Sequence, residues 1–161
     1  MGLHNPAHKQ GMNLLNHALG KIKSLTKTET KNLGGVYIIF DKDDIDNDEM
    51  LKVLNKADNR GINIGFSNSC FEVWLLAHFE KPNVSHTKDR LYQRLEHHLH
   101  CEQYSKKHKN DIDLLKRMED CVSTAMENTA TMKELNQITI NREPFTNIGN
   151  VIQCIYNRDM Y

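Results

Sequence analysis

The sequence predicts an α/β fold built on a parallel β-α-β unit, with a largely helical C-terminal half. Residues 36–40 (VYIIF) form a continuous apolar run of mostly β-branched and aromatic side chains, typical of a strand buried on both faces. A helical pattern follows over about residues 48–59, and a second short strand is expected over 62–66 (INIGF). Two strands joined by one helix in this way pair in parallel, through a right-handed crossover.

An amphipathic helix is expected before this unit, because apolar residues recur at helical spacing over residues 10–23. The polar stretch 25–35 ends in two glycines and is expected to be a loop into the first strand. Asp46 or Asn47 can cap the crossover helix, and Gly61 ends it. The inner side of that helix is expected to carry Met50, Leu51, Val53, Leu54 and Ala57.

The rest of the chain is expected to be helical. A short apolar helix over 70–79, opened by Ser67 or Asn68, is followed by amphipathic helices over 89–100 and 111–135. A final helix is expected over 144–159, with Pro144 near its first turn. We therefore expect one domain over residues 1–161, with a β-α-β core to about residue 80 and a helical part from about residue 87.

Composition restricts the class of protein. Lys plus Arg and Asp plus Glu number 21 each, so the formal net charge is zero and the overall field does not favour nucleic acid or membranes. No apolar segment approaches the roughly 18 residues of a membrane span, and the N-terminus lacks the apolar region of a signal peptide. The four cysteines are scattered without a CxxC pair, which is typical of reduced thiols in a cytoplasmic protein.

Carboxylates gather where the first strand ends, at Asp41, Asp43, Asp44, Asp46, Asp48 and Glu49. Ligands of parallel sheets bind at the carboxyl ends of the strands, and Ser67 follows the second strand at the same edge. If the extended backbone continues, Asp41 and Asp43 point to one side and suit Mg²⁺ or Mn²⁺. The alternative is a solvated loop whose acids favour the start of the next helix, above all for Asp44 and the acids that follow it.

Other polar side chains have two interpretations each. Glu72, in the first turn of an apolar helix, can favour the helix dipole or join Asp41 and Asp43 as a metal ligand. His78 is either a hydrogen-bonded core histidine or a site residue, and Asn68 either caps the helix or holds a loop. His97 and Cys101 are four residues apart, but no second ligand pair follows, so an exposed helix end is favoured over a metal site. Lys106 and Lys107, in the most basic stretch (KKHK), are either phosphate contacts or part of a solvated loop.

The pairing of FDKDD with SNSCFEVWLLAHFE resembles the RloB-like family, also described as AbiL-like, of bacterial phage-defence proteins. That family shows a strand ending close to FDxDD and a second strand running into SNxxFExWLLxHF. The chain matches the second pattern at Ser67, Asn68, Phe71, Glu72, Trp74, Leu75, Leu76, His78 and Phe79. YSK at 104–106 and PFT at 144–146 are similar to weaker downstream motifs, so the resemblance covers nearly the whole chain.

The resemblance implies a Toprim-like fold and a role in anti-phage defence, commonly beside an ATPase of the ABC or AAA-like kind. Toprim domains bind Mg²⁺ for phosphodiester chemistry with a glutamate on the first strand and an Asp-x-Asp pair on a later strand. Asp41 and Asp43 match that pair. The family's first strand, which reads like CEGxxTE and carries the glutamate, has no counterpart here. Either the chain starts internally or it is a short variant, and the uncovered edge or apolar face favours self-association or a partner.

Two functions are therefore expected from different classes. The first is a Mg²⁺- or Mn²⁺-dependent nuclease subunit acting on DNA or RNA, tRNA included, with Asp41, Asp43 and Glu72 as catalytic metal ligands. Lys106 or Lys107 would contact the nucleic-acid backbone. The second is a non-catalytic binding or assembly subunit of an ATPase-containing defence complex, which the missing glutamate and the neutral net charge favour.

Overall fold

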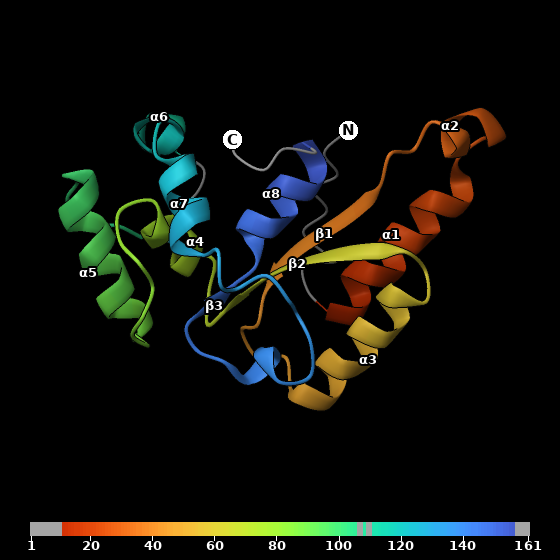
Figure 1. Ribbon diagram of the computed structural model, residues 1–161, viewed down its shortest axis with the longest axis horizontal. Coiled ribbons are helices and arrows are strands. Elements are labelled where there is room, and N and C mark those ends of the chain that lie inside the picture. Colours follow the sequence, from red (N-terminus) through yellow and green to blue (C-terminus); the bar gives the residue numbers. More distant parts are fainter. Residues whose placement is uncertain (1–10, 106–107, 109–110, 157–161) are drawn as a thin grey trace.

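The structure is a computed structural model, and it describes residues 11–105, 108 and 111–156. A three-stranded sheet in the order β1-β2-β3 lies between two groups of helices (Figure 1). The first part of the chain forms α1 (Gly11–Ser24), α2 (Lys27–Lys31), β1 (Val36–Asp41), α3 (Asn47–Asp58) and β2 (Ile62–Asn68). The second part forms α4 (Glu72–Ala77), α5 (Lys88–Leu99), α6 (Ile112–Glu119), α7 (Val122–Asn128), η2 (Thr139–Asn141), β3 (Phe145–Thr146) and α8 (Ile148–Tyr156). The predicted α/β class is confirmed.

The β-α-β unit forms as the sequence predicts. β1 and β2 are parallel and in continuous register, from Val36 opposite Ile62 to Asp41 opposite Ser67. α3 connects them, and its N-cap is Asp46, whose carboxylate accepts a hydrogen bond from the Glu49 amide at 2.7 Å. Gly61 follows the helix with a φ of +62°, a conformation that glycine adopts without steric cost. Local capping and turn chemistry therefore place both strand ends at one edge of the sheet.

One face of the sheet is covered by α1 and α3 (Figure 1). Ile38 and Phe40 of β1 and Phe66 of β2 are buried there against Leu15 of α1 and side chains of α3. Of the predicted inner residues of α3, Met50, Val53 and Ala57 are buried, whereas Leu51 and Leu54 are half-buried. The prediction for α1 is confirmed, and the predicted loop before β1 also contains α2, which opens with a capping box between Thr26 and Glu29.

The other face of the sheet is covered less completely. α8 packs on it at Gly65, where a Cβ atom would lie 2.9 Å from Ile39 Cγ1 and 3.0 Å from Ile148 Cδ1. Ile39 of β1 nevertheless stays 47% exposed. The expectation that both faces of the first strand are buried is therefore wrong for this face, because α8 covers β2 and leaves the middle of β1 open.

The C-terminal half is helical, but its boundaries differ from the prediction. α4 is shorter than expected, and its N-cap is Phe71 without a side-chain hydrogen bond, because Ser67 and Asn68 belong to β2. The expected helix over 111–135 is broken at Asp120 and Cys121 into α6 and α7. This break lets α6 bury Leu114 and Met118 while α7 packs Ala125 against a second core cluster formed with α4, α5 and α8.

β3 was not predicted. Phe145 and Thr146 pair antiparallel with Asn68 and Ser67, so the last helix begins at Ile148 and Pro144 lies before it. Within the described ranges, no helix has the length and apolar character that crossing a membrane requires.

Candidate functional site

The carboxyl ends of β1 and β2 form the edge at which the sequence places its acids. Asp41 is the last residue of β1 and lies opposite Ser67 in the parallel register. The Lys42 amide continues the pairing for one more bond, donating to the Ser67 carbonyl oxygen at 3.0 Å. The prediction that the acidic segment and the SNSC segment share one edge is therefore confirmed.

The backbone turns immediately after Asp41. Asp43 has a φ of +38°, and residues 43 and 44 form a turn. The condition under which Asp41 and Asp43 would point to the same side, a continued extended backbone, is not met. Asp44 is exposed in this turn.

Asp43 forms an ion pair that the sequence does not reveal. Lys88 Nζ, from the first residue of α5, lies 3.0 Å from Asp43 Oδ1. The hydrogen bond to Asp43 raises the pKa of the Lys88 ammonium group above its ordinary value. A lysine in the first turn of a helix opposes the helix dipole. The position of Lys88 is therefore the one signal in the sequence that it pairs with an acidic side chain outside α5.

Glu72 is fully buried at the start of α4. Burial raises the pKa of the nearby Cys70 thiol to about 12, and the charge of Glu72 and its hydrogen bond to the thiol act in the same direction. Asp41 also raises the pKa of Cys70 through its charge. Burial, followed by the charge of Glu72, likewise raises the pKa of the buried Tyr104 hydroxyl. Cys70 therefore lies within electrostatic reach of both predicted ligands, Asp41 and Glu72.

Polar contacts hold the segment before β3 against this edge. Asn68 Nδ2 donates to the carbonyl oxygens of Arg142 at 2.9 Å and Ile140 at 3.4 Å, so Asn68 holds a loop and does not cap α4. Lys42 Nζ donates to the same Ile140 carbonyl oxygen at 3.2 Å. The buried hydroxyls of Ser67 and Thr146 lie 2.9 Å apart and share a hydrogen bond.

His78 lies in the core at the end of α4. Its Nδ1 is 3.1 Å from the Trp74 carbonyl oxygen and 3.2 Å from that of Leu75, so an Nδ1–H donates there. Burial lowers the pKa of His78, and its ring packs edge-on against Trp74. These contacts match the interpretation of His78 as a hydrogen-bonded core histidine.

The described side chains do not form a ready metal site. In the part of the chain that the structure describes, no three His, Cys, Asp or Glu side chains are grouped so that they could hold a metal ion. A cation on Asp41, Asp43 and Glu72 therefore requires a rearrangement, at least the release of Asp43 from Lys88. Lys106 and Lys107 lie outside the described residues.

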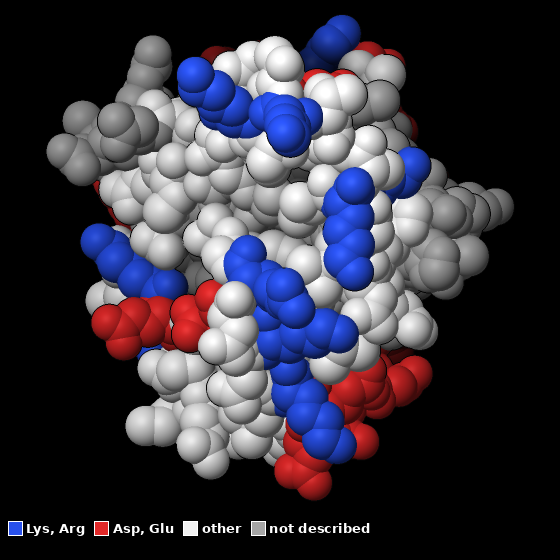
Figure 2. Space-filling view, turned by 90° about the vertical axis from the view of Figure 1, so that its right-hand side faces the viewer, with Lys and Arg blue, Asp and Glu red and all other residues white. Residues whose placement is uncertain are grey.

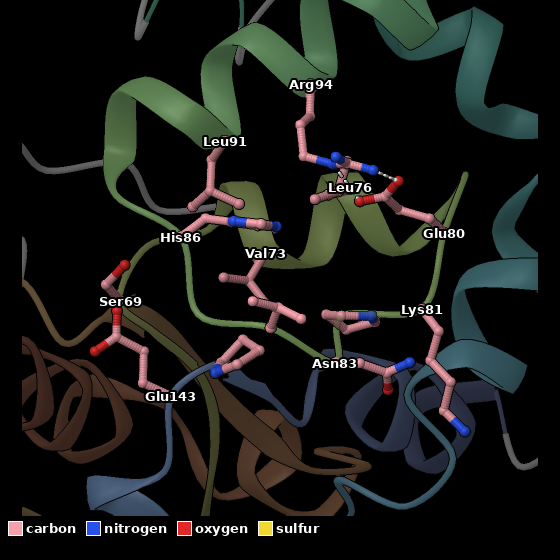
Figure 3. A pocket seen from close by; sticks show the side chains of 13 residues that line it. Ser69, Val73, Leu76, Glu80, Lys81, Asn83, His86, Leu91, Arg94 and Glu143 are labelled. Carbon is pink, nitrogen blue, oxygen red and sulfur yellow. Dashed lines mark hydrogen bonds and ion pairs between the residues drawn. The ribbon is translucent and has the colours of Figure 1, made fainter.

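A pocket of about 270 Å³ opens beside this edge, between α4, α5 and the segment that joins them (Figure 3). Ser69 and Glu143 border it near the sheet, and Val73, Leu76 and Leu91 form its apolar wall. At its far side Arg94 makes two hydrogen bonds to the Glu80 carboxylate, whose pKa they lower (Figure 3). Sequence reasoning missed this pocket, because its walls come from segments more than 70 residues apart in the chain (Ser69 and Glu143).

Comparison with known proteins places the chain in a family. The family model described as RloB-like protein matches residues 3–155. No curated protein and no solved structure matches the chain. Because the matched range covers nearly all of the 161 residues and includes both strand ends described above, the chain belongs to the RloB-like protein family.

Proposed function

We propose that this chain is a metal-dependent nuclease subunit of an anti-phage defence system, acting on DNA or RNA, tRNA included. The observation that carries the proposal is the position of Asp41 at the carboxyl end of β1, opposite Ser67 at the end of a parallel partner strand. This is the edge at which α/β sheets bind their ligands, and Asp43 follows within the same turn.

Mg²⁺ or Mn²⁺ would be held by Asp41 and Asp43, with Glu72 assisting. Such a cation supplies an activated water and neutralises charge on the phosphate when it is bound. In the structure, the ammonium group of Lys88 already neutralises Asp43. Asp43 therefore has to exchange a lysine for the cation, whereas Asp41 is already placed at the strand end.

A cleavage assay tests the proposal. The variant Asp41→Asn/Asp43→Asn should abolish Mg²⁺- or Mn²⁺-dependent cleavage of DNA, RNA or tRNA while the circular dichroism spectrum and melting temperature stay close to wild type. The matched control is Asp44→Asn/Asp48→Asn, which removes the same charge from two exposed positions nearby. Equal cleavage by wild type and by the Asp41/Asp43 variant would refute the assignment.

A different observation favours a second function. In that function, the chain is a non-catalytic assembly subunit that docks on an ABC or AAA-like ATPase or on another copy of itself. β1 lies at one edge of the described sheet, and its Ile39 is 47% exposed. An open strand edge with an exposed apolar side chain favours pairing with another chain.

Under this proposal, Ile39→Lys should weaken association in sedimentation experiments with the ATPase or at high concentration of the chain alone, and metal binding should be unchanged. Unaltered association of the Ile39→Lys variant would exclude this edge as the interface.

A further inference from the structure

The outer surface of α1 carries an open hollow of about 500 Å³, and none of the described residues that line it has an apolar side chain. Its residues repeat every three or four positions, so they form one stripe of the helix, at Asn13, Asn16, His17, Gly20, Lys21 and Ser24. Amides and an ammonium group supply hydrogen-bond donors along this stripe, whereas the Ser24 hydroxyl donates to the Lys21 carbonyl oxygen at 2.7 Å.

Lysines extend the hollow onto the neighbouring helices. Lys56 Nζ of α3 donates to Asn16 Oδ1 at 2.7 Å, which ties α3 to the hollow. Lys52 lies one turn earlier on α3 and is exposed. Lys27 and Lys31 are exposed one turn apart on α2. Figure 2 shows Lys and Arg side chains running down this side of the molecule, with acidic side chains beside them at the left and at the lower right.

The positive charge of this surface is not neutralised by ion pairs. In residues 11–105, 108 and 111–156, the ion pairs join Lys88 to Asp43, and Arg94 and His98 to Glu80, so these lysines take no part in them. α1 contains no acidic residue. The acid of α2, Glu29, is engaged by Thr26 in the capping box, and these hydrogen bonds lower its pKa. α3 carries exposed acids at its two ends, Asp48, Glu49 and Asp58, with Lys52 and Lys56 between them. A chain of zero net charge thus presents a basic surface over α1 and α2, which extends to the two lysines of α3.

We infer that this basic surface binds the phosphate backbone of a nucleic-acid duplex. The inference rests on the proposed function for nucleic acid as the substrate class, and it adds where the duplex lies. Lysines and polar donors that follow a surface bind phosphates without reading sequence. α1, α2 and α3 contain no Phe, Tyr or Trp, so the surface lacks the stacking platforms that single strands use.

An anionic membrane is the less suitable partner for this surface. Interfacial helices insert large apolar side chains beside their lysines. The exposed large apolar side chains of the described residues all lie outside α1, α2 and α3. Only the beginning of α3, at Asn47, adjoins the acidic turn. α2 precedes β1 and lies at the other end of that strand (Figure 1).

Fluorescence anisotropy with short DNA and RNA duplexes tests the inference. The measurement uses the Asp41→Asn/Asp43→Asn chain in EDTA, so that neither cleavage nor metal binding enters. Lys21→Gln/Lys27→Gln/Lys52→Gln should weaken duplex binding at least about tenfold, and lower the slope of log affinity against log salt by about 0.9 for each lost phosphate contact. The matched control, Lys81→Gln/Lys116→Gln/Lys133→Gln, removes the same charge from exposed positions elsewhere and should bind like its parent.

Equal duplex affinities of the two triple variants would overturn the inference. So would binding restricted to single strands, or binding of anionic vesicles in place of a duplex. Preferential binding of the DNA or the RNA duplex identifies the substrate, and either preference supports the inference. Duplex binding by a wild-type chain that neither cleaves the duplex nor takes up Mg²⁺ or Mn²⁺ would defeat the proposed nuclease and support this surface.

Discussion

At the scale of single residues, the ion pair between Lys88 and Asp43 decides how the acidic edge behaves. Lys88 Nζ lies 3.0 Å from Asp43 Oδ1, and the two side chains are 51% and 22% exposed. An ammonium group at this distance balances the charge of Asp43 much as a bound cation would. Metal binding should therefore compete with Lys88.

Removing Lys88 should strengthen metal binding. An exposed ion pair contributes about 0.2–1 kcal/mol, so Lys88→Gln should raise the Mn²⁺ affinity by up to about fivefold. Lys81→Gln removes an exposed lysine that does not contact Asp43 and serves as the control. A titration in which Lys88→Gln binds Mn²⁺ no more tightly than the control would show that Lys88 does not compete.

His78 makes folding sensitive to mild acid. Burial lowers its pKa from the ordinary value of 6.5, so the unfolded chain takes up a proton before the folded chain does. The contribution of His78 to stability is complete above pH 6.5 and is lost as the pH falls from there toward the lowered pKa. His78→Gln keeps a donor for the Trp74 carbonyl but does not titrate.

Urea unfolding at a series of pH values measures this contribution. The free energy of unfolding should fall less steeply below pH 6.5 for His78→Gln than for wild type, because the other histidines are present in both. Parallel curves for the two proteins would mean that His78 is protonated equally in the folded and unfolded states.

At the scale of elements, the contact between α8 and the sheet depends on Gly65. Its Cβ position would lie 2.9 Å from Ile39 Cγ1 and 3.0 Å from Ile148 Cδ1. Gly65→Ala should therefore destabilise the fold by about 1–3 kcal/mol, as overpacking in cores does. Gly20 lies inside α1 with nothing within 4 Å of its Cβ position, so Gly20→Ala should stabilise by about 0.5–1 kcal/mol.

Thermal or denaturant unfolding of the two alanine variants measures both effects. The test is that the two changes in the free energy of unfolding have opposite signs, although both variants replace a glycine with an alanine. If Gly65→Ala is as stable as wild type, α8 does not pack on the sheet as closely as the structure places it.

Elements specified by nearby residues could be predicted from the sequence. The apolar run of β1, the Asp46 cap and the glycine after α3 are local signals, and all three define the elements that the structure shows. The break between α6 and α7 could not be predicted, because it depends on how α7 packs against α4 and α8. β3 is only two residues long and exists through its pairing with Ser67 and Asn68, far away in sequence.

Part of the candidate site could also be predicted from the sequence, and part of it could not. The placement of Asp41 and Ser67 at one edge follows from two strands and a crossover, and could be predicted. The pairing of Asp43 with Lys88 and the proximity of Glu72 to Tyr104 join separate elements of the chain, and the sequence does not reveal them.

At the scale of the whole molecule, the neutral net charge conceals an uneven distribution of charge. Acids gather after β1, and within the described ranges the lysines of α1 and α2 take part in no ion pair. Figure 2 shows Lys and Arg side chains on this side of the molecule. Two core clusters, one between the sheet and α1 and α3, the other among α4, α5, α6, α7 and α8, hold these surfaces in place.

We propose that Asp41 and Asp43 together bind a divalent cation. Calorimetric titration of Mn²⁺ and Mg²⁺ into wild type and into Asp41→Asn/Asp43→Asn tests this proposal. Wild type should show saturable binding that disappears in the variant and persists in Asp44→Asn/Asp48→Asn. Absence of binding by wild type, or equal binding by the Asp41/Asp43 variant, would contradict it.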